Sequence, residues 1–198
     1  MTRSRTSTVH DALDDFVTRY LEAYPELFEV FDEEWRSPCE ISPPSRGRVQ
    51  WRPSPRKRAN DFTGLERALA IEIHPDIKAY FGSFWSGDLE AEADDGHVSL
   101  LFLWNADDVD RLVENLIGHA LQKRRRRQPF NVFFACTEKD SELILAVDND
   151  TGEVILEAPD KPPLRTVADD LATFLSTLRP ASPTQHPNAL SPDRGRLN

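Results

Sequence analysis

Apolar residues recur at helical spacing near the start of the chain. Seven of them line one face between Thr8 and Pro25: Val9, Leu13, Phe16, Val17, Tyr20, Leu21 and Tyr24. Thr8 and Asp11 stand at the two positions of a capping box, which satisfies the first backbone N–H groups of a helix. Pro25 has no N–H and is a natural stop. The pattern predicts a first helix that begins after Thr8 and ends before Pro25.

A proline-rich loop and two short helices are expected next. Residues 34–58 hold five prolines and predict an irregular segment with one short strand at RVQWR. The following string, FTGLERALAIEIHPDIKAYFGSF, predicts two helices with a break at His74 and Pro75. Proline suits the first position of the second helix, because no hydrogen bond is required of its nitrogen there. Ile77, Tyr80 and Phe81 should then face the core.

The spacing changes to a period of two after residue 87. Leu89, Ala91 and Ala93 alternate with acidic residues, which is typical of a strand with two different faces. Asp95 and Gly96 form a strong turn signal, and residues 97–104 return as an apolar partner strand. The segment predicts a β-hairpin.

The most regular helical pattern follows the hairpin. Asn105 can cap this helix, and Asp107 and Asp108 stand in its first turn, where negative charge is favoured by the helix dipole. Residues 123–127, KRRRR, form its basic end, and Pro129 terminates it. Helix termination and solubility are the expected roles of this basic end, with contact to lipid headgroups left open. The predicted buried stripe is Val109, Leu112, Val113, Leu116, Ile117, Ala120 and Leu121.

Three strands and one helix complete the expected order. The strings FNVFFAC, ELILAVDN and GEVILEA predict the strands, and a turn at residues 149–152 joins the last two. Thr166 and Asp169 are expected to cap a final helix that Pro180 ends. We therefore expect a single α+β domain at residues 1–180, with a mainly antiparallel sheet covered by helices. Residues 181–198 are rich in proline and serine and predict a disordered tail.

The distribution of charge adds a candidate surface. The chain has 198 residues, 34 acidic against 24 basic, which makes nucleic acid a poor first expectation for its partner. Residues 59–122 hold 13 acids and three bases, a net charge of −10 that equals the charge of the whole chain. Between Asp88 and Asp110 there are eight acids and no lysine or arginine. This local excess predicts a surface that binds a basic partner.

A second interpretation of the acidic strand stays open on the residues alone. Asp88, Glu90, Glu92 and Asp94 stand at every second position, so strand geometry would place them on one side. Charges on an edge strand also prevent sheets from pairing with one another. The acids therefore favour either a partner-facing surface or protection of a sheet edge.

Catalytic and metal-binding chemistry finds little support. Cys39 and Cys136 stand 97 residues apart without a CxxC string, and Cys136 and His119 fit core positions better than a site. Asp88, Glu90, Glu92 and His97 do not match the spacing of a calcium loop. We expect no metal, cofactor or catalytic residue, although the residues alone leave a metal-dependent hydrolase as an alternative.

The N-terminus has no apolar signal region, and the longest apolar run, LLFLW, is too short to span a bilayer, so a cytoplasmic protein is expected.

Several strings resemble the Syd family of SecY-interacting proteins. They are SPCEIS, VQWRP, LERALAIEIHPDIKAYFGSFWSGDLEA, DDVDRLVENLIGHALQKRR and DTGEVILE, with ENLIGH at residues 114–119 as the most specific. The similarity extends over residues 16–180, and the string HPDIKAYF also resembles the wider SUKH superfamily. It implies a SUKH-like fold without catalytic activity or cofactor.

The resemblance also implies a partner and a site. Syd proteins bind cytosolic loops of SecY through a concave, electronegative groove, attach peripherally to the cytoplasmic face of the inner membrane through that partner, and monitor or regulate its assembly. The alternative is a SUKH-type immunity protein that neutralises a basic toxin. Matching motifs carry four acids over to the binding surface: Glu66, Asp88, Asp108 and Glu114. Four more are added on charge: Glu90, Glu92, Asp94 and Asp107.

Overall fold

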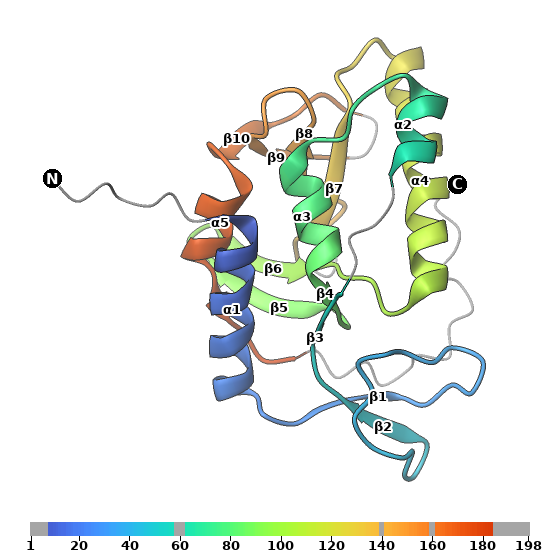
Figure 1. Cartoon of the computed structure of the whole chain (residues 1–198). Helices are drawn as coiled ribbons and strands as arrows, with labels where there is room; N and C mark the ends of the chain where they lie inside the picture. Colours follow the sequence, from blue (N-terminus) through green and yellow to red (C-terminus); the bar gives the residue numbers. More distant parts are fainter. Residues whose placement is uncertain (1–7, 58–61, 139–140, 159–160, 184–198) are drawn as a thin grey trace, which may run out of the picture.

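The computed structural model describes residues 8–57, 62–138, 141–158 and 161–183, and its centre is a curled antiparallel sheet. The seven strands run in the order β10-β9-β8-β7-β6-β5-β11 (Figure 1). Their bounds are β5 (Leu89–Ala93), β6 (Gly96–Leu100), β7 (Asn131–Cys136), β8 (Ile144–Asp148), β9 (Val154–Glu157), β10 (Arg165–Ala168) and β11 (Arg179–Pro180). The expected α+β class with an antiparallel sheet is confirmed.

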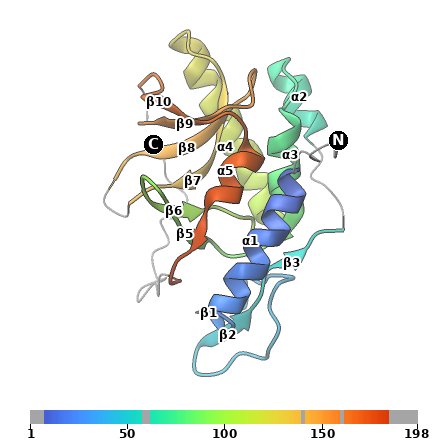
Figure 2. The ribbon, with the colours of Figure 1, turned by 90° about the vertical axis from the view of Figure 1, so that its left-hand side faces the viewer.

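Helices cover both faces of this sheet. Figure 2 shows α1 and α5 in front of the sheet and α4 behind it, with α3 to the right of α1. The helices are α1 (Val9–Ala23), α2 (Thr63–Leu69), α3 (Pro75–Ser83), α4 (Ala106–Arg125) and α5 (Leu171–Thr177). Two small sheets complete the fold, one formed by β1 (Leu27–Val30) with β2 (Arg48–Trp51) and one by β3 (Ser54–Pro55) with β4 (Phe84–Trp85).

Local signals in the sequence account for most of these boundaries. Thr8 and Asp11 form the expected capping box of α1. Pro75 occupies the first turn of α3, and the Asn105 side chain accepts hydrogen bonds from the first N–H groups of α4. The three expected strands after α4 are present as β7, β8 and β9.

The final helix differs from the prediction. Residues 165–168 pair with β9 as strand β10, so Thr166 and Asp169 do not cap a helix. The cap is Asp170, whose Oδ1 accepts a hydrogen bond of 2.7 Å from the Thr173 N–H. The free edge of β9 offers hydrogen bonds that the Thr166 signal could not reveal, since sheet pairing is set by tertiary context.

The chain after α5 returns to the sheet. The helix ends at Thr177 rather than at Pro180, because residues 179–180 pair with β5 as β11. The Ala181 N–H then donates to the Glu90 carbonyl over 2.9 Å. Of the expected tail at residues 181–198, the part from residue 184 onward lies outside the described residues.

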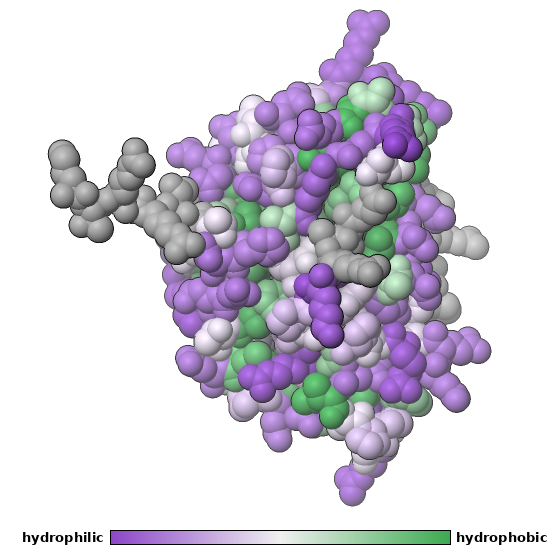
Figure 3. Space-filling model, viewed as in Figure 1, coloured by the Kyte–Doolittle hydropathy of each residue, from purple (hydrophilic) through white to green (hydrophobic). Residues whose placement is uncertain are grey.

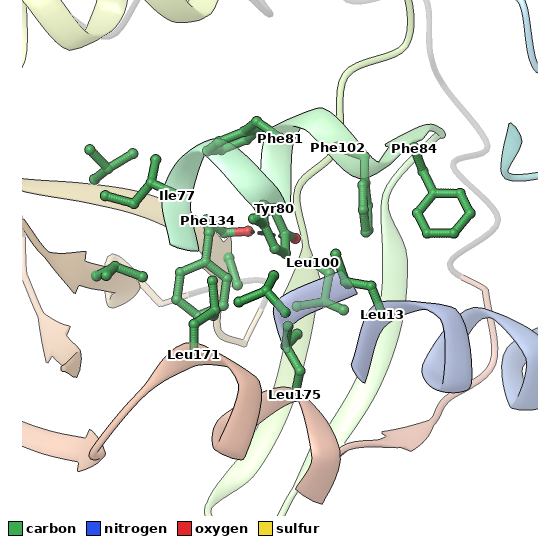
Figure 4. Close-up of a cluster of buried hydrophobic side chains, with 14 of the residues drawn as sticks. Leu13, Ile77, Tyr80, Phe81, Phe84, Leu100, Phe102, Phe134, Leu171 and Leu175 are labelled. Carbon is green, nitrogen blue, oxygen red and sulfur yellow. Dashed lines mark hydrogen bonds between the residues drawn. The ribbon is translucent and has the colours of Figure 1, made fainter. Parts of the chain in front are cut away.

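The core between α1, α3, α5 and the sheet is centred on Tyr80. Its ring stacks on Phe102 with centroids 5.2 Å apart and meets Phe134 edge-on at 5.5 Å (Figure 4). The Tyr80 hydroxyl donates to the Phe134 carbonyl over 3.3 Å, which satisfies the one polar group of a fully buried side chain. Burial raises the pKa of Tyr80, so the phenol stays neutral.

A buried ion pair fastens α4 to the other face of the sheet. Lys123 and Glu157 are only 6% and 1% exposed, and the Lys123 Nζ lies 2.8 Å from the Glu157 Oε2. Asn131 donates to the same oxygen over 2.8 Å, and its own amide oxygen lies 2.8 Å from the His119 Nε2. Burial lowers the pKa of His119 and favours its neutral form. The expected role in solubility is therefore wrong for Lys123, whose side chain is buried, while residues 124–127 are exposed.

Removal of the buried ammonium tests this fastening. In Lys123→Ala the Glu157 carboxylate would stay buried without its counter-charge, so the free energy of unfolding should fall by about 3–5 kcal/mol. Arg125→Ala, two residues away and exposed, should change it by less than about 0.5 kcal/mol. Urea denaturation followed by circular dichroism measures both, and equal values for the two variants would contradict the proposed role of the pair.

The turn between β8 and β9 permits a second test. Gly152 has φ +80°, and a Cβ built on it would lie 2.7 Å from the His74 Nε2. Gly152→Ala should therefore lower the free energy of unfolding by about 2 kcal/mol or more, through backbone strain and overpacking together. Gly64→Ala in α2, where a Cβ meets nothing within 4 Å, should instead stabilise the protein slightly. A thermal melt of the two variants should show shifts of opposite sign.

Candidate binding surface

The β5–β6 hairpin separates apolar from acidic side chains. Leu89 and Ala91 are completely buried in the core, so strand alternation directs Glu90 and Glu92 to the opposite face. The cross-strand partners of Glu90 form a row across that face. The row ends at Glu157, which pairs with Lys123 of α4: Glu90, Ser99, Cys136, Ile144 and Glu157. The strand acids therefore lie on the α4 side of the sheet.

Glu90 and Glu92 flank a histidine on this face. The Glu90 side chain is buried, and its Oε2 lies 2.8 Å from the His97 Nε2. The Glu92 Oε1 lies 3.5 Å from the other ring nitrogen of His97, and the Glu92 side chain is 49% exposed. Glu90 thus takes part in an internal hydrogen bond, whereas Glu92 faces solvent.

The acids at the two ends of β5 have different surroundings. Asp94 lies in the turn with a side chain that is 89% exposed, and its Oδ1 is 3.1 Å from an Arg179 guanidinium nitrogen. The next residue, Asp95, pairs over 2.6 Å with Arg165 of β10, which shows how far the sheet curls. Asp88, before the strand, is partly exposed and accepts a long 3.5 Å hydrogen bond from the Phe102 N–H.

The acids of α4 divide into capping and exposed groups. The Asp108 carboxylate accepts a 2.9 Å hydrogen bond from the Trp104 N–H and lies 3.9 Å from Arg111. Asp107 and Glu114 are exposed. At 100° per residue they lie opposite the buried stripe of the helix, so they point away from the sheet. They extend the negative surface along the outer side of α4 without converging on Glu92.

Glu66 stands apart from the other predicted site residues. Its Oε1 accepts a 2.9 Å hydrogen bond from the Ile73 N–H and lies 2.6 Å from the Lys78 Nζ. The carboxylate thereby joins α2 to α3. Both ribbon views show α2 well separated from the β5–β6 hairpin (Figures 1 and 2). The structure brings Asp88, Glu90, Glu92 and Asp94 together and leaves Glu66 outside that group.

Two members of the acidic face are not apparent from the sequence. His97 stands there only as a candidate metal ligand, whereas the turn after Ala93 makes it the direct cross-strand partner of Glu92. Glu138, at the end of β7, accepts a 3.4 Å hydrogen bond from the His97 N–H. No spacing rule links residues 41 positions apart in the chain, so only the pairing of β6 with β7 could reveal Glu138.

The cysteines lack the surroundings of a nucleophile. Burial raises the pKa of Cys39 to about 12, which keeps the thiol protonated. Burial also raises the pKa of Cys136, and the negative charges of Asp88 and Glu90 act in the same direction. Across the described ranges, no three His, Cys, Asp or Glu side chains gather in a way that could hold a metal ion.

None of the helices in the described part of the chain is both long and apolar enough to cross a bilayer. α4 is the longest at 20 residues, and its solvent side carries the acids and arginines described above.

Comparisons with known proteins identify the family. The model of the Syd protein (SUKH-2) family matches residues 10–180. Protein Syd of Pseudoalteromonas atlantica is 38% identical over 184 residues, which cover 89% of this chain and 98% of the relative. Protein Syd of Colwellia psychrerythraea is 39% identical, with 88% and 94% covered, and that of Hahella chejuensis is 44% identical, with 73% and 74% covered. The chain belongs to the Syd family.

Proposed function

We propose that this protein is a non-enzymatic binding protein that docks its acidic surface on basic cytosolic loops of the translocon subunit SecY. It acts at the cytoplasmic face of the inner membrane, to which it attaches peripherally through this partner, and it monitors or regulates SecY assembly. The observation that carries the proposal is the run from residue 88 to residue 110, which holds eight acids and no lysine or arginine. Family membership supplies the choice of partner.

The charge of the expected partner supports the assignment. Cytoplasmic loops of membrane proteins carry an excess of lysine and arginine. A surface of exposed carboxylates attracts such a loop and guides its approach, and it repels acidic partners. A lipid surface is a poor partner for these acids, because the cytoplasmic leaflet is itself negative.

The contacts of the predicted site residues divide them into two roles. Glu92 and Asp94 on the hairpin and Asp107 and Glu114 on the outer side of α4 have exposed carboxylates, and we propose these two patches as contacts for the loops. Glu66, Glu90 and Asp108 accept hydrogen bonds from neighbouring groups, which makes them positioning residues. Asp88 has features of both roles, because it accepts a long hydrogen bond and is partly exposed.

Charge reversal tests the contact surface. The triple variant Glu92→Lys, Asp94→Lys and Glu114→Lys should weaken binding to a peptide of a SecY cytosolic loop by at least tenfold, because attraction becomes repulsion. A control with the same change in net charge reverses three exposed acids elsewhere: Asp14, Glu22 and Asp150. The control should bind within about threefold of the parent at 150 mM salt, where charges beyond about 8 Å are screened.

Co-purification with SecY-containing membranes provides the second readout of the same variants. Equal loss in both triple variants would mean that net charge, rather than this surface, governs binding. Unchanged binding in both would remove the proposal. The affinity of the parent should also fall as salt is raised.

Glu66→Gln separates a positioning residue from a contact residue. The change removes the charge that pairs with Lys78 while the side-chain oxygen can still accept from the Ile73 N–H. The free energy of unfolding should fall by about 1 kcal/mol, since this pair is partly screened by solvent. Loop-peptide affinity, measured by calorimetry on the folded protein, should stay within twofold of the parent. A large loss of affinity at unchanged stability would instead make Glu66 a contact residue.

A further inference from the structure

The small sheet of β1 and β2 gathers apolar side chains on its outer face. Five large apolar residues are exposed within the described part of the chain, and three belong to this region. They are Phe28 at 45%, Val30 at 36% and Ile41 at 58% exposure. Figure 3 shows apolar surface among polar side chains at the lower end of the molecule, where Figure 1 draws β1 and β2. Grouped apolar exposure on a soluble protein points to an interaction site.

Strand register places these three side chains on one face. Phe28 lies opposite Gln50 in the β1–β2 pair, and Val30 lies opposite Arg48. On the other side of β2, the Ile41 N–H donates to the Gln50 carbonyl over 2.9 Å. The alternate positions of both strands face inward and are buried at Leu27, Val49 and Trp51. Phe28, Val30 and Ile41 therefore share the outward face.

Arginines border the same apolar residues. The Arg48 guanidinium lies 5.4 Å from the centre of the Phe28 ring and donates to the Phe28 carbonyl over 3.4 Å. Arg52 follows at the alternating position, and Arg46 is exposed in the turn before β2. Glu29 has the opposite strand parity, and its carboxylate accepts a hydrogen bond from the Val30 N–H. The outer face thus combines apolar and positively charged side chains, with the exposed acids Glu26 and Asp32 just beyond the two ends of β1, in a protein of net charge −10.

We propose that this arginine–apolar face, formed by Phe28, Val30, Ile41, Arg46, Arg48 and Arg52, binds the surface of an anionic lipid bilayer directly. Aromatic and aliphatic side chains enter the region between headgroups and acyl chains, while arginines pair with lipid phosphates. Each arginine near an anionic surface raises partitioning by about fivefold. The proposal goes beyond the docking on SecY, because it uses a surface of the opposite sign.

Two other occupants fit less well. A second copy of the chain would bring arginines against arginines in a twofold dimer, and three apolar side chains are far fewer than the 20 to 30 residues that each partner of a stable complex usually buries. A nucleic acid would use the arginines, but single strands bind through stacked aromatic rings, and this face has one ring beside two aliphatic side chains. Lipid uses both kinds of side chain.

Vesicle sedimentation without SecY tests the proposal. The full chain should bind vesicles of phosphatidylglycerol and phosphatidylethanolamine, and not vesicles of phosphatidylcholine alone. Arg48→Glu with Arg52→Glu should reduce binding to the anionic vesicles at least tenfold, and Phe28→Ser with Ile41→Ser should reduce it at least fivefold. Matched controls at other exposed sites, Arg125→Glu with Arg127→Glu and Leu121→Ser with Leu164→Ser, should bind like the parent.

Several outcomes would overturn the proposal. They are absence of binding to anionic vesicles, equal binding to neutral vesicles, or equal loss in the controls. Tighter binding to a single-stranded oligonucleotide that depends on Arg48 would assign the face to nucleic acid instead. A dimer in sedimentation velocity that Phe28→Ser with Ile41→Ser dissociates would assign it to a second copy.

Binding of the SecY loop peptide keeps the two proposals separate. It should be unchanged in Arg48→Glu with Arg52→Glu. A failure of lipid binding would then leave the SecY proposal standing, and a failure of peptide binding would leave the lipid proposal standing. Melting curves of the four variants confirm that each is folded before its binding is compared.

Discussion

Strand β5 depends on a strict difference between its two faces. Leu89 and Ala91 have no exposure and complete the core beneath α1 and α5, while Glu90 and Glu92 must lie on the other face. A slip of one residue would bury both carboxylates in the core and expose the apolar pair, at a cost far above the stability of a small domain. The turn at Gly96 and the edge strand β11 hold the register. Core packing therefore fixes where the acidic surface lies.

The face of the sheet that α4 covers has its own constraint, which is the pair of Lys123 and Glu157. Since the pair is buried, each charge needs the other, and Asn131 with His119 completes the hydrogen bonds. Lys123 lies in the last turn of α4. The pair therefore holds this end of the helix against β9 and, through Asn131, against β7.

Patterns that involve a few neighbouring residues predict this fold well. The capping box at Thr8, the cap at Asn105 and the hairpin after Leu89 act locally, and the structure has them where the sequence indicates. The errors arise where tertiary partners decide. Residues 165–168 carry a helix-start signal but pair with the open edge of β9. Lys123 belongs by sequence to a basic run but forms an ion pair with Glu157, 34 positions later.

The group of acids from Asp88 to Asp94 could be predicted from period-two spacing. The separate role of Glu66 could not, because Lys78 and Ile73 become its partners only when α2 packs beside α3.

The repulsion between the hairpin acids is relieved by residues that come from elsewhere in the chain. His97 lies against Glu90, Arg179 against Asp94, and Arg165 against Asp95. The last two are exposed ion pairs, which contribute little to stability. A basic segment could therefore take their place at small cost, whereas the buried Glu90 with its histidine would remain. Edge protection does not account for these acids, because β5 lies inside the sheet between β6 and β11. The exposed pairs at Asp94 and Asp95 agree with the proposed binding of a basic partner.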